Sequence, residues 1–410
     1  MIPAGTSLDS EGARRRRRAV RARIVRTLVA AWLTLAAGAR AGMAAPYVPA
    51  SGAVVVETLP RRTEVQPPEM LALRAQLRAS PNDANIAASL AQQYIALGRR
   101  ESDPRYFGYA QAVLAPWWSV GAPPAPVRLL RATLRQTNHQ FAEAMSDLDA
   151  LTKSDPANAQ AWLTRATVQT VRGDYAGATS SCARLSNLSG QLASFTCLAA
   201  ARANTGDPLA SERLLRAAFS REAAEAPPEV RVWTLTLLAE LSARRGDPSA
   251  DQSFRQALAI APRDSYLLGA YADYLLDQGR PAEAERLLKS FQRIDSLLLR
   301  YALALKQQSA GTTSVRAELQ ARFDAAAARG DSVHLREQAR FTLHLLGDAQ
   351  SAVALARRNW ETQKELADLR LLLEAGERAH DSAAVAQATT WIRTHKVEDA
   401  AIAALMKGGA

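Results

Sequence analysis

Residues 155–178 read DPANAQAWLTRATVQTVRGDYAGA, and this stretch decides the fold. Gly173 and Asp174 separate two segments that carry small and apolar residues at helical spacing. Glycine takes the left-handed conformation just past the end of a helix, and aspartate caps the helix that follows. The stretch therefore predicts two helices joined by a tight turn.

The same turn recurs along the chain beyond residue 68. It is found at Gly206-Asp207-Pro208, Gly246-Asp247-Pro248, Gly279-Arg280-Pro281 and Gly347-Asp348-Ala349, and we add Gly98, His139, Gly311 and His380 to the series. The intervals then centre on 33 and 34 residues, with insertions of about seven residues in RRESDP and about six in REAAEAPPE. The alternative, a generic bundle of alanine- and leucine-rich helices, predicts no constant interval between helix ends.

A 34-residue helix–turn–helix period resembles the tetratricopeptide repeat (TPR), and specifically an exported bacterial protein of that type. The family's glycine at position 166 and its aromatic residue at position 169 are absent, so several repeats are degenerate. The resemblance implies an all-α, right-handed superhelical solenoid of about nine TPR-like repeats. The residues that carry it are clearest in two repeats: Trp162, Ala166, Gly173, Tyr175 and Ala178, and then Ala272, Gly279, Pro281, Ala284 and Leu288.

The chain begins with a pattern typical of an export signal. Residues 27–39 read TLVAAWLTLAAGA, an uncharged stretch that follows an arginine-rich one and precedes small residues at 39–44. Thirteen helical residues rise only ~20 Å against a bilayer core of ~30 Å, so we expect no stable membrane span after cleavage. An organelle transit peptide, a signal that is retained, and a translation start near Val20 remain as alternatives.

We therefore expect four segments along the chain. Residues 1–44 form a signal peptide, residues 45–67 an extended linker with several prolines, residues 68–397 the TPR-like solenoid, and residues 398–410 a C-terminal helix or tail. Within the solenoid, a single helix at 68–79 precedes the first complete pair.

The positive charge of the chain lies largely outside the predicted solenoid. The formal net charge is +11, and residues 1–44 hold nine arginines and two acidic residues, a net of +7 that leaves +4 for the other 366 residues. A nucleic-acid-binding surface needs its cations concentrated on the folded part of the chain. The distribution argues against nucleic acid as the partner.

What the resemblance implies for binding is a concave wall lined by the first helix of each pair, through residues about 13, 10, 6, 3 and 2 places before the turn. Such a wall suits an extended peptide or a helix. In the amino-terminal half the wall is neutral: Thr133, Gln136, Gln160, Thr167, Thr170 and Asn204. In the carboxyl-terminal half it is aromatic and net acidic: Trp233, Glu240, Arg244, Tyr266, Asp273 and Asp277, continued by His334, Glu337, Phe341 and His344.

Trp233 and Tyr266 are the aromatic anchors that we expect in this wall, because buried aromatic side chains dominate binding energy at protein interfaces. The alternative is that both rings merely pack between neighbouring repeats. A second aromatic pair, Trp117-Trp118, lies in the connector APWWSVGAPPAP, where it either offers a contact or fills the joint between two repeats; we favour the second.

The two cysteines of the chain, Cys182 and Cys197, are equidistant from the Ser189-Gly190 turn. In an antiparallel helix pair, residues equidistant from the turn lie at the same height, so the two sulfurs can meet. Either they form a disulfide, which an oxidising compartment permits, or they are two small buried residues that face different ways.

Motifs for catalysis and for metal binding are missing from the sequence. It contains no His-Glu-x-x-His, no phosphate-binding glycine loop, no nucleophile elbow and no paired-cysteine zinc pattern. His334 and His344 lie ten residues apart, which is ~15 Å along a helix and too far for one ion. We expect no catalytic residues, no metal and no cofactor, and therefore no enzyme.

Together these features predict a non-catalytic protein-binding scaffold or adaptor of the cell envelope, periplasmic or secreted. The expected partner is a protein that offers an extended peptide or a helix, not a nucleic acid and not a small-molecule substrate. The alternatives are a membrane-anchored assembly factor that retains its signal, and an accessory subunit of an envelope enzyme.

Overall fold

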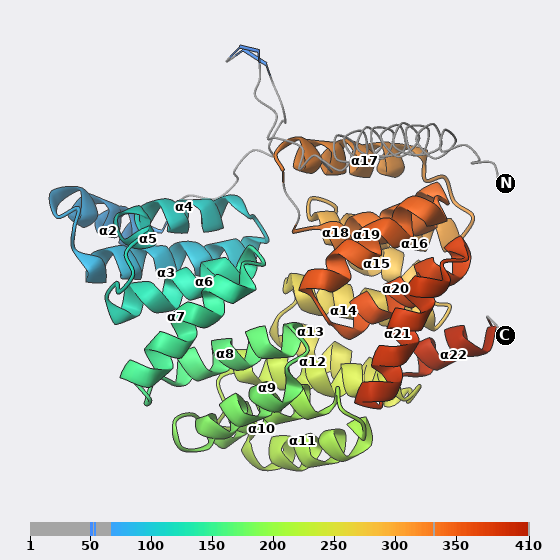
Figure 1. Ribbon diagram of the computed structural model, residues 1–410, viewed down its shortest axis with the longest axis horizontal. Helices are drawn as coiled ribbons and strands as arrows, with labels where there is room; N and C mark the ends of the chain where they lie inside the picture. The colour runs from blue at the N-terminus through green and yellow to red at the C-terminus, as the bar shows by residue number, and fades with distance from the viewer. Residues whose placement is uncertain (1–49, 52, 55–66, 331–332, 409–410) are drawn as a thin grey trace, which may run out of the picture. The chain divides into compact units, whose positions relative to one another are not determined.

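The computed structural model describes residues 50–51, 53–54, 67–330 and 333–408 (Figure 1). The predicted signal peptide and most of the predicted linker lie outside these residues. The chain divides into two bodies, residues 1–56 with 327–330, and residues 57–326 with 331–410. The second body holds the array of helices, and the described residues contain no strand.

Helix pairs, here called units 1 to 9, follow one another along the described part of the array (Figure 1). A single helix, α2 (Pro68–Ala79), precedes them. Units 1 to 4 are α3 (Ala84–Glu101) with α4 (Arg105–Val113), α6 (Ala125–Thr137) with α7 (Phe141–Ser154), α8 (Ala159–Val171) with α9 (Tyr175–Ala183), and α10 (Gln191–Arg202) with α11 (Pro208–Glu222). Between them lie two short helices, α5 (Ala115–Trp118) and the 3-10 helix η1 (Arg184–Asn187).

Units 5 to 9 continue the series to the end of the described chain. They are α12 (Pro228–Arg244) with α13 (Ser249–Ile260), α14 (Ser265–Asp277) with α15 (Pro281–Leu288), α16 (Asp295–Gln307) with α17 (Thr313–Ala328), α18 (Leu335–Phe341) with α19 (Ala349–Thr362), and α20 (Leu366–Ala379) with α21 (Ser382–His395). A π-helical turn, η2 (Thr342–Leu346), extends α18. The last helix is α22 (Ala400–Gly408).

The buried apolar side chains form successive clusters along the array. These clusters span residues 70–134, 132–168, 166–201, 192–238, 232–345 and 339–402. Each span overlaps the next, so a unit buries its apolar faces against its neighbours in the sequence. This nearest-neighbour packing is the mark of a repeat array and confirms the predicted all-helical solenoid.

The predicted turns have the backbone conformation that their residues favour. Gly173, Gly206, Gly246, Gly279 and Gly347 have φ between 65° and 90°. His139 and His380 take the same left-handed conformation in place of glycine, at φ 57° and 53°. The aspartates that follow cap the next helices, as where Asp174 accepts from Gly177 N at 2.9 Å.

Two members of the predicted series do not take the left-handed conformation. Gly98 lies inside α3, which continues for one more turn to a left-handed Ser102 at φ 50°. A Cβ on Gly98 would lie 2.9 Å from Phe107 Cε1, so glycine serves close helix packing there. Gly311 is likewise not left-handed, and Ser309, at φ 56°, ends the first helix of unit 7 instead.

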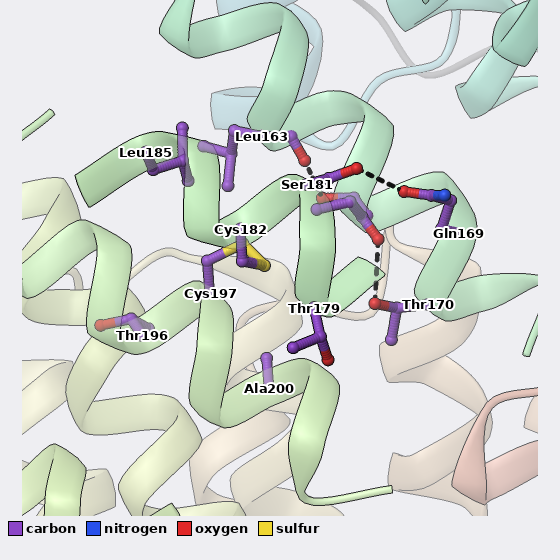
Figure 2. The surroundings of a disulfide bond; sticks show 12 residues. Leu163, Gln169, Thr170, Thr179, Ser181, Cys182, Leu185, Thr196, Cys197 and Ala200 are labelled. Carbon is purple, nitrogen blue, oxygen red and sulfur yellow. Dashed lines mark hydrogen bonds between the residues drawn. A yellow bond between two sulfur atoms is a disulfide. The ribbon is translucent and has the colours of Figure 1, made fainter. Parts of the chain in front are cut away.

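The predicted pairing of the cysteines is present in the structure. Cys182 on α9 and Cys197 on α10 form a disulfide with a Cα–Cα distance of 5.5 Å (Figure 2). Both side chains are buried, in a cluster that also contains Ala166 and Leu185. The bond therefore joins units 3 and 4 inside their shared core.

Trp117 and Trp118 fill the joint between units 1 and 2, as we favoured. Both rings pack partly buried against the first apolar cluster. Arg131 fixes the joint from α6, because its Nη1 donates to the carbonyl oxygens of both tryptophans at 2.9 and 2.8 Å. Its other nitrogens bind the buried Asp147 carboxylate at 2.6 and 2.8 Å.

Candidate peptide-binding cavity

Residues of units 3 to 9 line a cavity of about 1240 Å³. The first helices of units 4 to 9 all contribute to its lining, from α10 through α12, α14, α16 and α18 to α20, and α22 completes it. This is the arrangement that the resemblance implies for the first helix of each pair. No helix in the described ranges is both long and apolar enough to cross a membrane.

Among the predicted wall residues of units 2 to 6, seven line this cavity and five do not. Those in the lining are Thr170, Asn204, Glu240, Arg244, Tyr266, Asp273 and Asp277. Those outside it are Thr133, Gln136, Gln160, Thr167 and Trp233. Residues outside the lining come mainly from the amino-terminal units, because units 2 and 3 supply four of the five.

The hydroxyl and amide groups of units 2 and 3 are largely engaged within their own helices. Thr133 is buried and its hydroxyl donates to Leu129 O at 2.9 Å. The hydroxyl of Thr167 donates to Leu163 O at 3.0 Å, and Gln160 Nε2 donates to Thr164 Oγ1 at 3.2 Å. Their role in binding stays a prediction.

Tyr266 is the aromatic side chain that the cavity offers to a ligand. It lies on α14, and 65% of its surface is exposed inside the cavity. Its hydroxyl donates to Glu240 Oε1 of α12 at 2.7 Å, which holds the ring in place. Burial raises the pKa of Glu240 to about 7, and the carboxylate charge in turn raises the pKa of Tyr266 well above its usual range.

Trp233 has a different environment, although it also precedes its turn glycine by thirteen residues. It packs, partly buried, against the cluster that holds Cys182, Cys197 and Leu185. Trp233 therefore belongs to the joint between units 4 and 5 and does not face the cavity.

The acidic residues of the wall are neutralised by arginines of following units. Asp273 on α14 binds Arg300 of α16 at 2.6 Å and Arg340 of α18 at 2.7 Å. Burial opposes ionisation of Asp273, but the two guanidinium groups outweigh it and lower its pKa to about 2. Asp277 likewise binds Arg370 of α20 at 2.6 Å.

The prediction of a net acidic wall is therefore wrong. The lining contains eight arginine or lysine residues and seven aspartate or glutamate residues. Counting positions back from each turn identified only Arg244 among these cations, because it considers each unit alone, whereas Arg300, Arg340 and Arg370 reach back to acidic residues of an earlier unit. Many charged side chains in the cavity lining form ion pairs, and the lining as a whole has almost no net charge.

Arg336, another residue that the sequence analysis missed, lies in the centre of the ion-pair network. Its Nη1 is 2.6 Å from Glu365 Oε2 and 3.4 Å from Asp368 Oδ1. Burial opposes the charge of the guanidinium, but these carboxylates dominate and raise its pKa well above the usual range. Burial also raises the pKa of Asp368, to about 6.

The remaining wall residues of unit 8 are placed as follows. Phe341, expected in the wall, is buried in the core at 1% exposure, because the helix packs this face against unit 7. Glu337 and His344 line the cavity, with His344 Nε2 3.5 Å from Glu374 Oε2. His334 occupies the N-cap position of α18, but its side chain makes no capping hydrogen bond. In the described ranges, no three histidine, cysteine or acidic side chains are grouped so that they could hold a metal ion.

Comparison with known proteins gives likenesses of fold at low identity. A monomeric mutant of IFIT1 with Gppp-AAAA is 14% identical, with a TM-score of 0.41 over 83% of this chain and 85% of that one. Yeast Tom70 is 12% identical, with a TM-score of 0.34 over 83% of this chain and 90% of that one. A tetratricopeptide repeat protein from Parabacteroides merdae is 14% identical, with a TM-score of 0.29 over 69% of this chain and 98% of that one.

No protein-family model matches the chain, and no curated protein matches its sequence. The solved structures are too distant for any of them to lend this chain a function. The fold rests on the chain's own geometry: consecutive antiparallel helix pairs, left-handed turn residues and nearest-neighbour cores. By that geometry the described part of the chain is an all-helical array of repeated helix pairs.

Proposed function

We propose that this chain is a non-catalytic, protein-binding scaffold or adaptor of the cell envelope that captures a peptide or helix in the cavity. The observation that carries the proposal is Tyr266, a large aromatic side chain left 65% exposed within a concave surface. An aromatic ring that is fixed by a hydrogen bond loses little entropy on binding and can serve as an anchor.

The size of the cavity sets the length of the ligand. A helix about 10 Å across, including its side chains, fills 1240 Å³ over about 16 Å, which is about ten residues at 1.5 Å each. The nearly balanced charges of the wall favour a segment that carries both acidic and basic side chains around an apolar or aromatic centre.

A periplasmic or secreted location is supported by the disulfide and by the predicted signal peptide. Disulfides persist in oxidising compartments and are rare in the cytosol. We expect the mature protein to begin near residue 45 and to fractionate with soluble envelope proteins. A precursor mass that persists in the membrane fraction would instead favour the anchored assembly factor.

Crosslinking from the cavity tests the binding role. A photo-crosslinking amino acid placed at Tyr266 should capture a specific protein in living cells, and mass spectrometry of the adduct should identify the captured segment. The control position is Leu214 on α11, which is 41% exposed and lies outside the cavity lining. Adducts of the same identity and yield from both positions would contradict capture in the cavity.

A further inference from the structure

The turns of units 2 to 5 are in contact with residues near the C-terminal end of the array. We call the residues in these turns the turn row: His139, Gly173, Gly206 and Gly246. We call the residues that contact them the clasp: Gln363, Lys364, Trp391, Lys396 and Ala400. The two sets are more than 150 residues apart in the sequence for each contacting pair, and both belong to the body of residues 57–326 and 331–410.

The contact is closest at Gly173. A Cβ on this glycine would lie 2.6 Å from Trp391 Cη2, a separation that no real side chain tolerates. Beside it, the backbone amide of Lys364 donates to Val171 O at 2.7 Å. The hydroxyl of Tyr175 donates to Lys364 O at 3.2 Å.

The contact continues along the next two turns. Ideal Cβ positions on Gly206 and Gly246 lie 3.3 Å from Lys396 Cβ and 4.0 Å from Ala400 Cβ. Between them, Arg244 Nη2 donates to Ala203 O at 2.8 Å and to Glu398 O at 3.2 Å. In Figure 1 this is where α21 and α22, in red, lie beside α12, which α22 contacts directly.

Other turns of the same conformation lack this contact. Gly279 and Gly347 have φ of 65° and 76°, but a Cβ on either would meet nothing within 4 Å. Glycine at these two positions serves the left-handed turn alone. Gly173 serves the turn and also admits the Trp391 ring, so its role in the clasp can be separated experimentally from its role in the turn.

The clasp and its neighbours form one side of the cavity. Lys364, Glu365, Asp399 and Ala400 line the same space as Tyr266. The contacts that hold them on the turn row are single interactions spread along it: the Lys364 amide on Val171 O, the Tyr175 hydroxyl on Lys364 O, the Arg244 guanidinium on Glu398 O, Gln363 against His139, and the rings of Trp391 and His395 against Tyr175. Such a contact can separate while each unit keeps its own core, because the cores are formed between sequence neighbours.

We propose that the clasp is a gate, and that the partner segment enters the cavity when the clasp leaves the turn row. This inference rests on the proposed function, because a gate has a purpose only if the cavity receives a ligand. A partner that binds the open array more tightly than the closed one shifts the population towards the open form by its difference in affinity.

A thiol inside the cavity reports the opening. Ser265 begins α14 and lines the cavity, and Ser265→Cys is a nearly isosteric change. The two native cysteines are bonded to each other, so the introduced thiol is the only free one. Its reaction rate is measured with N-ethylmaleimide and with a maleimide that carries a long polyethylene glycol chain. Both rates depend equally on the fraction of thiolate, so the rate of the bulky reagent divided by that of the small one reports how easily a large molecule reaches the cavity.

Gly173→Ala in this background should raise the rate ratio of bulky to small reagent about tenfold, because the added methyl group displaces Trp391. Gly279→Ala is the matched control, since it introduces the same left-handed strain without a neighbour, and it should change the ratio less than about twofold. Hydrogen exchange at the Lys364 amide should rise in the first variant and stay unchanged in the second.

Tyr175→Phe tests the gate without threatening the fold. It removes only the hydroxyl that donates to Lys364 O, and the ratio should rise about threefold. If Gly173→Ala loses its helical circular dichroism signal, the rate ratio of Tyr175→Phe is the test of the gate. Equal ratios in the Gly173 and Gly279 variants, an unchanged ratio in Tyr175→Phe, or full access of the bulky reagent to the Ser265→Cys parent would overturn the gate.

The two proposals fail in distinguishable ways. If the gate is real but the cavity binds no partner, the rate ratio rises in Gly173→Ala while crosslinking from Tyr266 yields no specific adduct in either form. If the cavity binds a partner without a gate, crosslinking succeeds and Gly173→Ala changes neither the ratio nor the yield.

Discussion

Tyr266 and Trp233 show at the scale of the residue how equal positions in a repeat acquire different roles. Each precedes its turn glycine by thirteen residues, but Tyr266 lies in the first turn of α14 whereas Trp233 lies farther along the longer α12. Tyr266 projects into the cavity, whereas Trp233 packs against the disulfide cluster. The sequence predicts the face of the helix for both, but the neighbouring unit decides what that face meets.

Single truncations should separate these two roles. Trp233→Ala should lower the free energy of unfolding by about 2–3 kcal/mol, because it removes a ring from a packed joint. Tyr266→Ala should change it by less than about 1 kcal/mol and should instead weaken partner capture. Urea denaturation followed by circular dichroism measures the first effect, and the yield of captured partner measures the second. Equal losses of stability would show that Tyr266 is also a core residue.

Glu240 should make stability depend on pH. Its folded pKa is raised to about 7, so its contribution to stability is complete below about pH 4.5 and is lost as the pH rises through 7. We expect the wild-type chain to lose about 1–2 kcal/mol relative to Glu240→Gln between pH 5 and pH 8. Denaturant midpoints of both chains at the two pH values measure the difference. A constant difference would mean that the carboxyl titrates normally.

At the scale of the element, the joint between units 1 and 2 depends on one buried ion pair. Arg131 and Asp147 are 3% and 5% exposed, and Arg131 also holds the carbonyl groups of α5. Without its partner the arginine stays buried and uncompensated, which generally costs several kcal/mol.

We therefore expect Asp147→Asn to destabilise the chain by about 3 kcal/mol in chemical denaturation. Asp149→Asn is the control on the same helix, because Asp149 pairs with Arg165 at 2.7 Å but its side chain is 54% exposed. That variant should stay within about 0.5 kcal/mol of wild type. Similar losses for both variants would contradict the special role of burial.

The ends of helices could be predicted where a glycine follows the helix, but not where a serine takes its place. The glycines at 173, 206, 246, 279 and 347 lie at left-handed turns as predicted. Ser102 and Ser309 take the same left-handed conformation, but nothing in the local sequence marks them. The turns were predicted at the nearby glycines 98 and 311 instead. Residues other than glycine rarely take this conformation, so a local rule that looks for glycine does not find these two serines.

At the scale of the whole molecule, two imidazoles lie where the clasp meets the turn row and its neighbours. His139 Nδ1 lies 3.2 Å from Gln363 Nε2, and the His395 ring packs on Trp391 and Tyr175 with centroids 4.1 and 5.2 Å away. Burial lowers the pKa of both histidines. For His139, Arg336 and His334 act in the same direction, while Glu365 and Glu337 oppose it.

Acid should therefore loosen the clasp. A lowered folded pKa gives stability that is present above about pH 6.5 and is lost as the pH falls through the folded value. We expect hydrogen exchange at the Lys364 amide, corrected for its intrinsic pH dependence, to accelerate between pH 7.5 and pH 5.5. The double variant His139→Asn, His395→Gln should show little of this acceleration, and asparagine suits the left-handed turn at 139. A response of equal size in both chains would assign it to other groups.

The sequence by itself determined the helix pairs and their order, and it placed the two cysteines where they could meet, because each of these features depends on residues within one or two repeats. Left-handed glycines, capping aspartates and small residues at crossing points act over a few residues, so the printed chain displays them. Only the tertiary structure decided which wall residues share a cavity, which arginines neutralise the acids, and that the clasp meets the turn row. These outcomes depend on small rotations between units that add up along the array, and no local pattern encodes their sum.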